Sequence, residues 1–304
     1  MGYKILERIE LNNTVTKLVL DAPLVSRHAK AGEFVIVRAT SDGERIPLTI
    51  HDYDRTKGTI SIIIQVVGLS TMKLNSLKVG ECVSDVVGPL GKATPLDGVD
   101  RTLVIGGGVG SAISFPICKE LKEKGKYVDA ILGFRNKDLV ILEDEFKNNS
   151  DNLYLYTDDG SKGIKGFVTS NLEELVLKNK YDCVFVIGPV IMMKNVSLIT
   201  NKLNVKTLVS LNPLMIDGTG MCGCCRVTVG GKMKFACIDG PDFDASLVDF
   251  DELITRNKMY FEEEKKARDE SCNLFKGVKW VTKKELQWDY LMTNQEKQHL
   301  KKLL

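Results

Sequence analysis

The stretch TLVIGGGVGSAISF, residues 102–115, decides the fold of this 304-residue chain. Its apolar start has the pattern of a buried strand, its middle holds four glycines and one valine, and its end opens a helix that continues to about residue 125. Glycine lacks a Cβ, so a pyrophosphate can approach such a turn closely and face the free N–H groups of the helix N-terminus. The stretch therefore predicts an α/β domain with a nucleotide at this turn; the alternative is a tight turn without a ligand.

Strands and helices alternate from residue 99 to residue 211, on both sides of this turn. An alternation of this kind predicts a doubly wound parallel sheet, covered by helices on both faces. Further buried strands are expected at residues 127–136, 153–159, 183–189 and 206–212.

Two stretches in this domain support a nucleotide site, because nucleotides bind where the carboxyl ends of the strands of an open sheet come together. Gly188 and Pro189 end a strand and precede a helix, as the glycine turn does. Asp158 ends another strand, and a carboxylate there can accept hydrogen bonds from a ribose diol and repel a 2′-phosphate. This favours NAD(H) over NADP(H), whereas the alternative treats Asp158 and Asp159 as a turn-forming acidic pair.

The first 98 residues consist of short β-rich runs at intervals of about ten residues, which predicts a small antiparallel barrel or sandwich. Within it, ERIPLT (residues 44–49) places Arg45 beside a proline and a threonine, and VVGLST (residues 66–71) places a glycine and two hydroxyls at a helix start. An arginine fork and a helix start both suit a flavin pyrophosphate. The alternative for Arg45 is an ordinary surface arginine next to a strand.

A cysteine-rich loop, DGTGMCGCC, follows at residues 217–225. Counted from Asp217 the spacing is D-x4-C-x2-C, and eleven residues separate Cys225 from Cys237. Plant-type iron–sulfur loops have C-x4-C-x2-C with a distant fourth cysteine, so the spacing matches with aspartate at the first ligand. Two alternatives stay open: a zinc ion held by three of these cysteines with Asp217 or Cys224, and a four-cysteine cluster in which Cys224 replaces Asp217.

Composition narrows the class of protein. Lysine plus arginine (42) nearly balance aspartate plus glutamate (40), which gives no support for a nucleic acid or an anionic membrane as partner. No run reaches the roughly 18 apolar residues of a membrane span, and the N-terminus lacks a signal-peptide pattern. We therefore expect a soluble cytoplasmic protein, whose eight cysteines are reduced thiols or metal ligands.

Taken in order, R-x-P-L-T, V-G-L-S-T, G-G-G-V-G, T-D-D-G, G-P-x-x-M-M and D-G-T-G-M-C-G-C-C-R-V-T-V resemble the ferredoxin–NADP reductase-like superfamily. The resemblance covers about residues 1–265 and is to the branch with a C-terminal 2Fe-2S loop. Within that branch the chain is similar to the small subunits of NADH-dependent reduced ferredoxin:NADP oxidoreductases, also called sulfide dehydrogenases. Aspartate at the first cluster position marks that group, whereas the electron-transfer subunits of dihydroorotate dehydrogenase, a related group, have cysteine there.

The resemblance implies four parts and three cofactors: FAD, NAD(H) and a 2Fe-2S cluster. The parts are an FAD-binding antiparallel β-barrel (residues 1–98), an NAD-binding α/β domain (residues 99–211), a 2Fe-2S module (residues 212–245) and a helical C-terminal tail (residues 246–304). The matching positions would hold FAD through Arg45, Pro47, Leu48, Thr49, Gly68, Ser70 and Thr71. They would hold NAD(H) through Gly107, Gly108, Val109, Gly110, Asp158, Gly188 and Pro189. They would hold the cluster through Asp217, Cys222, Cys225 and Cys237.

The implied activity is electron transfer between NAD(H), FAD and the cluster in a bifurcating NADPH/NAD/ferredoxin oxidoreductase. The implied partner is a larger iron–sulfur flavoprotein subunit with a second FAD, two 4Fe-4S clusters and the NADP site, through which ferredoxin reacts. Hydride transfer requires no acid or base, so no catalytic side chain is predicted. The alternatives are a dihydroorotate dehydrogenase electron-transfer subunit and a non-catalytic, metal-stabilised docking subunit.

Overall fold

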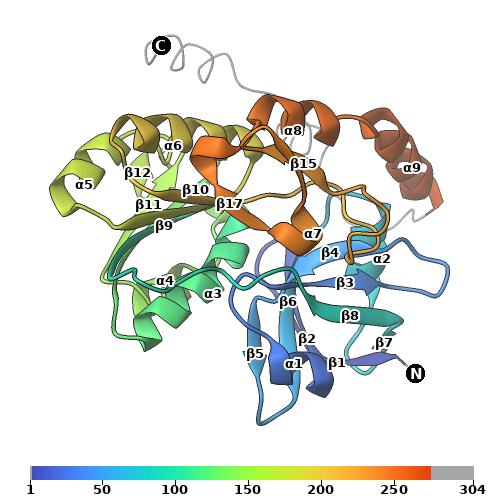
Figure 1. Cartoon of the computed structure of the whole chain (residues 1–304). Helices are drawn as coiled ribbons and strands as arrows, with labels where there is room; N and C mark the ends of the chain where they lie inside the picture. The colour runs from blue at the N-terminus through green and yellow to red at the C-terminus, as the bar shows by residue number, and fades with distance from the viewer. Residues whose placement is uncertain (1, 275–304) are drawn as a thin grey trace.

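The computed structural model describes residues 2–274 (Figure 1). The helical tail predicted up to residue 304 lies outside the described residues from residue 275 onward. Along the described part of the chain, no helix combines the length and the apolar composition that crossing a membrane requires.

Two antiparallel sheets form the N-terminal part and enclose one apolar core, which confirms the prediction for this region. Short apolar runs such as TISIIIQ supply the strands, because their inward side chains are fully buried. The larger sheet has the order β5 (Asp52–Asp54), β6 (Thr59–Gln65), β2 (Val15–Asp21), β1 (Tyr3–Glu10) and β7 (Cys82–Val83); the smaller has β4 (Ile46–Thr49), β3 (Phe34–Arg38) and β8 (Asp85–Leu90). Two helices, α1 (Pro23–His28) and α2 (Leu69–Ser76), belong to this part.

A seven-stranded sheet follows, and all of its strands run parallel except the last. The order is β12 (Ile164–Lys165), β11 (Asn152–Thr157), β10 (Tyr127–Phe134), β9 (Arg101–Gly107), β13 (Cys183–Ile187), β14 (Thr207–Ser210) and β17 (Asp242–Asp244). The helical elements between these strands are α3 (Gly110–Glu123), η1 (Lys137–Leu139), α4 (Glu143–Asn148), α5 (Leu172–Asn179) and α6 (Val190–Lys202). An apolar core lies on each face of this sheet, so the predicted doubly wound architecture is confirmed.

The cysteine loop leads into a hairpin of β15 (Arg226–Val229) and β16 (Lys232–Phe235), then α7 (Ala236–Asp239). The chain next returns through β17 to pair antiparallel with β14, which the sequence did not predict. The remaining described elements are η2 (Ala245–Leu247), α8 (Phe250–Asn257) and α9 (Phe261–Leu274). Because β17 extends the large sheet, the chain after the hairpin is fixed at the edge of the α/β part, whereas the cysteine loop lies over the barrel (Figure 1), with Gly218 close to Ile36 and Leu90.

One buried histidine fixes the antiparallel part to α3. Nδ1 of His51 donates to the carbonyl of Ala112 at 2.8 Å, and the imidazole stacks on Phe115 with ring centroids 5.1 Å apart. Burial lowers the pKa of His51 to about 4, so the ring is neutral at pH 7. Beside it, Nζ of Lys119 reaches Asp52 at 2.9 Å. His51 is therefore part of the contact that positions the start of α3, next to the glycine turn.

Candidate functional site

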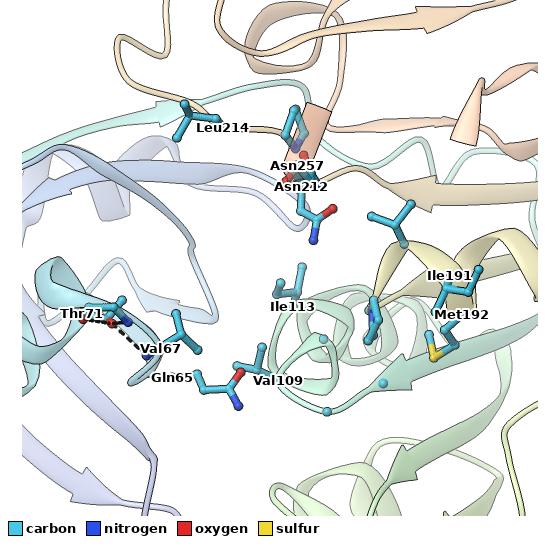
Figure 2. Close-up of a pocket in the computed structure, with 18 of the residues that line it drawn as sticks. Gln65, Val67, Thr71, Val109, Ile113, Ile191, Met192, Asn212, Leu214 and Asn257 are labelled. Atoms are coloured by element: carbon cyan, nitrogen blue, oxygen red, sulfur yellow. Dashed lines mark hydrogen bonds between the residues drawn. The ribbon is translucent and has the colours of Figure 1, made fainter. Parts of the chain in front are cut away.

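A cleft of about 2320 Å³ lies where the smaller antiparallel sheet, the carboxyl ends of the parallel strands and the cysteine loop meet. Figure 2 shows side chains from separate segments around one space, such as Gln65 at the end of β6, Val109 after β9, Met192 in α6 and Leu214 before the cysteine loop. The structure brings together in its lining most of the nucleotide-binding residues predicted from sequence: Arg45, Pro47, Gly68, Ser70, Thr71, Gly107, Gly108, Val109, Gly110, Asp158, Gly188 and Pro189. Leu48 and Thr49 do not line it, and Leu48 packs against the barrel core instead.

The barrel wall of the cleft carries Arg45 and the start of α2. Nε of Arg45 donates to the carbonyl of Ile216 at 2.9 Å, so the guanidinium joins this wall to the residue that precedes Asp217. The hydroxyl of Thr71 accepts the N–H groups of Val67 and Gly68, each at 3.0 Å, and thereby shapes the turn before α2 (Figure 2). Ser70 donates its hydroxyl to the carboxylate of Glu44.

The glycine turn packs directly against the turn that follows β13. A Cβ on Gly110 would lie 2.4 Å from the carbonyl oxygen of Ile187, and a Cβ on Gly107 would lie 2.4 Å from Sδ of Met192. The clash at Gly110 is with backbone, so glycine there lets the two strand–helix turns lie side by side, whereas at Gly107 the flexible side chain of Met192 would have to move. Gly108, between them, has open space where a Cβ would stand and lines the cleft, so the backbone of the turn is accessible there, as a nucleotide pyrophosphate requires.

Asp217 holds the cysteine loop in shape. Its Oδ2 accepts the N–H of Thr219 at 2.9 Å, the hydroxyl of Thr219 at 2.5 Å and the N–H of Met221 at 3.2 Å. The hydroxyl bond from Thr219 contributes most to lowering the pKa of Asp217, which keeps the carboxylate charged at neutral pH. A charged carboxylate at this place suits both a loop brace and a metal ligand.

Cys225 of the loop and Cys237 of α7 form a buried pair, whereas Cys222 and Cys224 of the loop are more accessible. Sγ of Cys225 and Sγ of Cys237 are 3.1 Å apart and buried, and burial raises the pKa of Cys237 to about 12. Cys222 is exposed, and the N–H of Cys224 lowers the pKa of its thiol. Over residues 2–274 no three His, Cys, Asp or Glu side chains converge as a single-metal site does.

This arrangement fits a two-iron cluster, in which the ligands are divided between the two irons. Cys225 and Cys237 form one close pair without a disulfide, while Asp217 and Cys222 stand on the outer part of the same loop. Backbone N–H groups of Gly220 and Cys224 face the sulfurs of Cys237 and Cys222, as expected where thiolate charge is stabilised. Cys224 differs from the other loop cysteines, because it lines the cleft and its carbonyl accepts Nη2 of Arg256 at 3.2 Å.

The sequence did not reveal one part of the cleft. The last residue of α8 and residues after it also line the cleft, and they belong to a charged, helix-prone segment whose pattern resembles that of a solvated helix. No motif in the sequence marks them; only the return of the chain through β17 and α8 brings them to the cleft. They are Asn257, Lys258, Met259, Tyr260, Phe261, Glu263, Glu264, Lys265 and Ala267.

Known proteins are similar to this chain over most of its length. The family model for the iron–sulfur cluster binding domain of dihydroorotate dehydrogenase B matches residues 212–249. A dihydroorotate dehydrogenase B (NAD(+)) electron transfer subunit homolog of Thermotoga maritima is 45% identical over 86% of this chain and 93% of its own length. The electron transfer subunit of Geobacillus sp. is 34% identical over 77% of this chain and 92% of its own length.

Solved structures give the same fold. A chain from the structure of NADH-dependent reduced ferredoxin–NADP oxidoreductase, described for flavin-based electron bifurcation, superposes with a TM-score of 0.84. It is 43% identical and covers 89% of this chain and 98% of its own length. The ferredoxin reductase in carbazole 1,9a-dioxygenase, at 19% identity and a TM-score of 0.59 over 67% of this chain and 66% of its own, shares the fold alone.

Proposed function

This chain belongs to the family of dihydroorotate dehydrogenase B electron-transfer subunits and their homologues, and on that premise we propose that it passes electrons between NAD(H), FAD and a 2Fe-2S cluster within a bifurcating NADPH/NAD/ferredoxin oxidoreductase. The observation that carries the proposal is the single cleft in which most of the predicted flavin residues and the predicted NAD residues meet Cys224 of the cysteine loop.

The barrel wall would hold FAD, with Arg45 and the start of α2 at its pyrophosphate and Pro47, Leu48 and Thr49 in the strand beside it. The glycine turn, Gly188 and Pro189 would hold NAD(H), and the Asp158 carboxylate would accept hydrogen bonds from its ribose. When bound, the flavin accepts a hydride from NADH and can release electrons one at a time. The chain's own contribution is to orient the two nucleotides and to limit the access of water.

Asp217, Cys222, Cys225 and Cys237 hold the cluster in this proposal. Two hydrogen bonds connect their loop to the nucleotide cleft: Arg45 to the carbonyl of Ile216, and Arg256 to the carbonyl of Cys224. These bonds hold the loop in a fixed position relative to the cleft, which suits electron transfer between a flavin and a cluster.

An electron-transfer subunit works with a catalytic partner, and the outer part of the cysteine loop is where we place it. Met221, between two proposed ligands, is 88% exposed, and Ile238, beside Cys237, is exposed as well. Apolar side chains left in water next to a proposed redox centre suit contact with another protein. The partner proposed here is the larger iron–sulfur flavoprotein subunit, with its own FAD, two 4Fe-4S clusters and an NADP site.

A second candidate function, the electron-transfer subunit of a dihydroorotate dehydrogenase, is favoured by the family match over residues 212–249. Asp217 at the first cluster position argues for the bifurcating group. The lining of the cleft, which retains the predicted flavin and NAD residues, argues against a docking subunit without catalysis.

The proposed function is tested by co-producing the chain with the larger iron–sulfur flavoprotein subunit proposed as its partner. The complex is purified without oxygen, and one reductant is added at a time. We expect NADH to bleach the flavin and, in the reverse direction, NADPH to drive reduction of both NAD⁺ and ferredoxin. Dihydroorotate should have no effect. Bleaching by dihydroorotate with an FMN-containing partner would instead support the second candidate, and a colourless, iron-free complex would contradict both.

Replacing Asp217 by cysteine tests its assignment as a ligand. We expect Asp217→Cys to keep about two irons per chain and to change both the electron paramagnetic resonance spectrum and the reduction potential, because thiolate is a softer ligand than carboxylate. Asp244→Cys is the matched control, since Oδ1 of Asp244 accepts the N–H and hydroxyl of Ser246 in the same kind of turn. Identical spectra for wild type and Asp217→Cys would leave Asp217 as a loop brace only.

A further inference from the structure

The C-terminal segment forms a wall of the cleft at the flavin end. Tyr260 and Glu264 line the same space as Arg45 and Ser70, and helix α9 packs against α2. Figure 1 shows α9 next to α2, above the barrel. The inference that follows rests on the proposed FAD site, because it concerns the half of FAD for which no residue has been assigned.

FAD extends in two directions from its pyrophosphate. The flavin half has to meet the nicotinamide, so it lies toward the glycine turn and the cysteine loop. The adenosine half would extend away from the flavin half, and the cleft lining near the start of α2 includes the start of α9, which packs against α2. The segment at the start of α9 is therefore placed where an adenosine would arrive.

We propose that Tyr260 and Glu264 form the adenosine subsite of the flavin nucleotide, with the Tyr260 ring against the adenine and the Glu264 carboxylate accepting the ribose hydroxyls. Tyr260 lies in the cleft wall and is 51% exposed, so one part of its ring is open to a base. Stacking of a base on an aromatic ring is tolerant of geometry and strengthens binding by roughly tenfold.

The carboxylates near this subsite need hydrogen-bond donors. Glu264 lies close enough to Glu44 and Glu263 that partial burial and these two negative charges raise the pKa of Glu264. Glu44 already accepts the hydroxyl of Ser70, at the start of α2. Carboxylates that lie close together near a phosphate site repel one another unless hydrogen-bond donors lie between them. A ribose diol supplies two O–H donors.

A comparison of FAD with FMN isolates the contribution of the adenosine half to binding. FMN contains the isoalloxazine, the ribityl chain and one phosphate but no adenosine. The experiment measures dissociation constants of FAD and FMN for the apoprotein of wild type, Tyr260→Ala, Tyr260→Phe, Glu264→Gln and Glu262→Gln. Glu262 is the matched control on the same helix, because its side chain is 77% exposed, approaches Lys265 at 3.7 Å and is not part of the cleft lining.

We expect Tyr260→Ala and Glu264→Gln each to weaken FAD binding about tenfold and to leave FMN binding unchanged. Tyr260→Phe and Glu262→Gln should match wild type for both flavins, and an unchanged thermal unfolding midpoint shows that the variants are folded. Equal losses for FAD and FMN, or no loss for FAD, would overturn the subsite while the flavin site stands. A wild-type chain that binds neither flavin would overturn the proposed function itself.

Discussion

Cys237→Ser is expected to lose the cluster: iron and acid-labile sulfide should fall from about two per chain to near zero. The sulfur of Cys237 lies buried, 3.1 Å from that of Cys225, and serine offers a harder ligand that is protonated at neutral pH. Since a bound cluster stabilises the folded loop, the thermal unfolding midpoint should fall as well. Iron and sulfide assays, with electron paramagnetic resonance after reduction, measure the loss.

The matched control is Cys224→Ser, which changes a neighbouring cysteine of the same loop. Cys224 points to the cleft side and is outside the buried pair, so its replacement should keep the full iron content. If Cys224→Ser loses iron while Asp217→Ala keeps it, the four-cysteine alternative is correct. If Cys237→Ser keeps its iron, neither cluster assignment holds.

Local patterns of the sequence predicted the sheets and the nucleotide turns, because each depends on neighbours in the chain. The buried strand β9, the glycine turn and α3 occur within 23 residues, and periodicity together with glycine spacing is enough to recognise them. The cysteine loop is similarly local, although spacing alone left Asp217, Cys224 and zinc open.

Contacts between distant segments were not predictable in this way. The pairing of β17 with β14 and the approach of Tyr260 and Glu264 to α2 depend on how the chain returns over the α/β part. Leu48 shows a smaller effect: it belongs to the R-x-P-L-T motif, yet its side chain packs against the barrel core, so any contact with FAD there would come from the backbone of the strand. A sequence motif identifies the segment, whereas tertiary packing determines which of its atoms line the cleft.

Arg45 joins the two proposed centres, since it is proposed to hold the flavin pyrophosphate and also donates to the carbonyl of Ile216 at 2.9 Å, next to Asp217. The positive charge of Arg45 also attracts the carboxylate of Asp217 and helps to lower its pKa. One side chain therefore takes part in the flavin wall and in the shape of the cysteine loop.

We expect Arg45→Ala to weaken FAD binding by roughly 10- to 100-fold, because a hydrogen bond to a charged phosphate contributes about 1.5–3 kcal/mol. Arg45→Lys should recover part of the affinity, since lysine keeps the charge but lacks the planar fork. Arg55→Ala is the matched control: Nη2 of Arg55 donates to the carbonyl of Ala29 at 2.8 Å, in the same barrel but outside the cleft lining.

Because Arg45 contacts both the cleft and the cysteine loop, its replacement should affect the cluster as well as the affinity for FAD. Without the bond to Ile216 the cysteine loop loses a fixed point, so Arg45→Ala should also change the electron paramagnetic resonance spectrum of the cluster, even when FAD is saturating. Flavin titration and spectra recorded on the same reduced samples, purified without oxygen, measure both effects. A variant with weakened FAD binding and an unaltered cluster spectrum would separate the two centres, and unchanged FAD affinity would remove Arg45 from the flavin site.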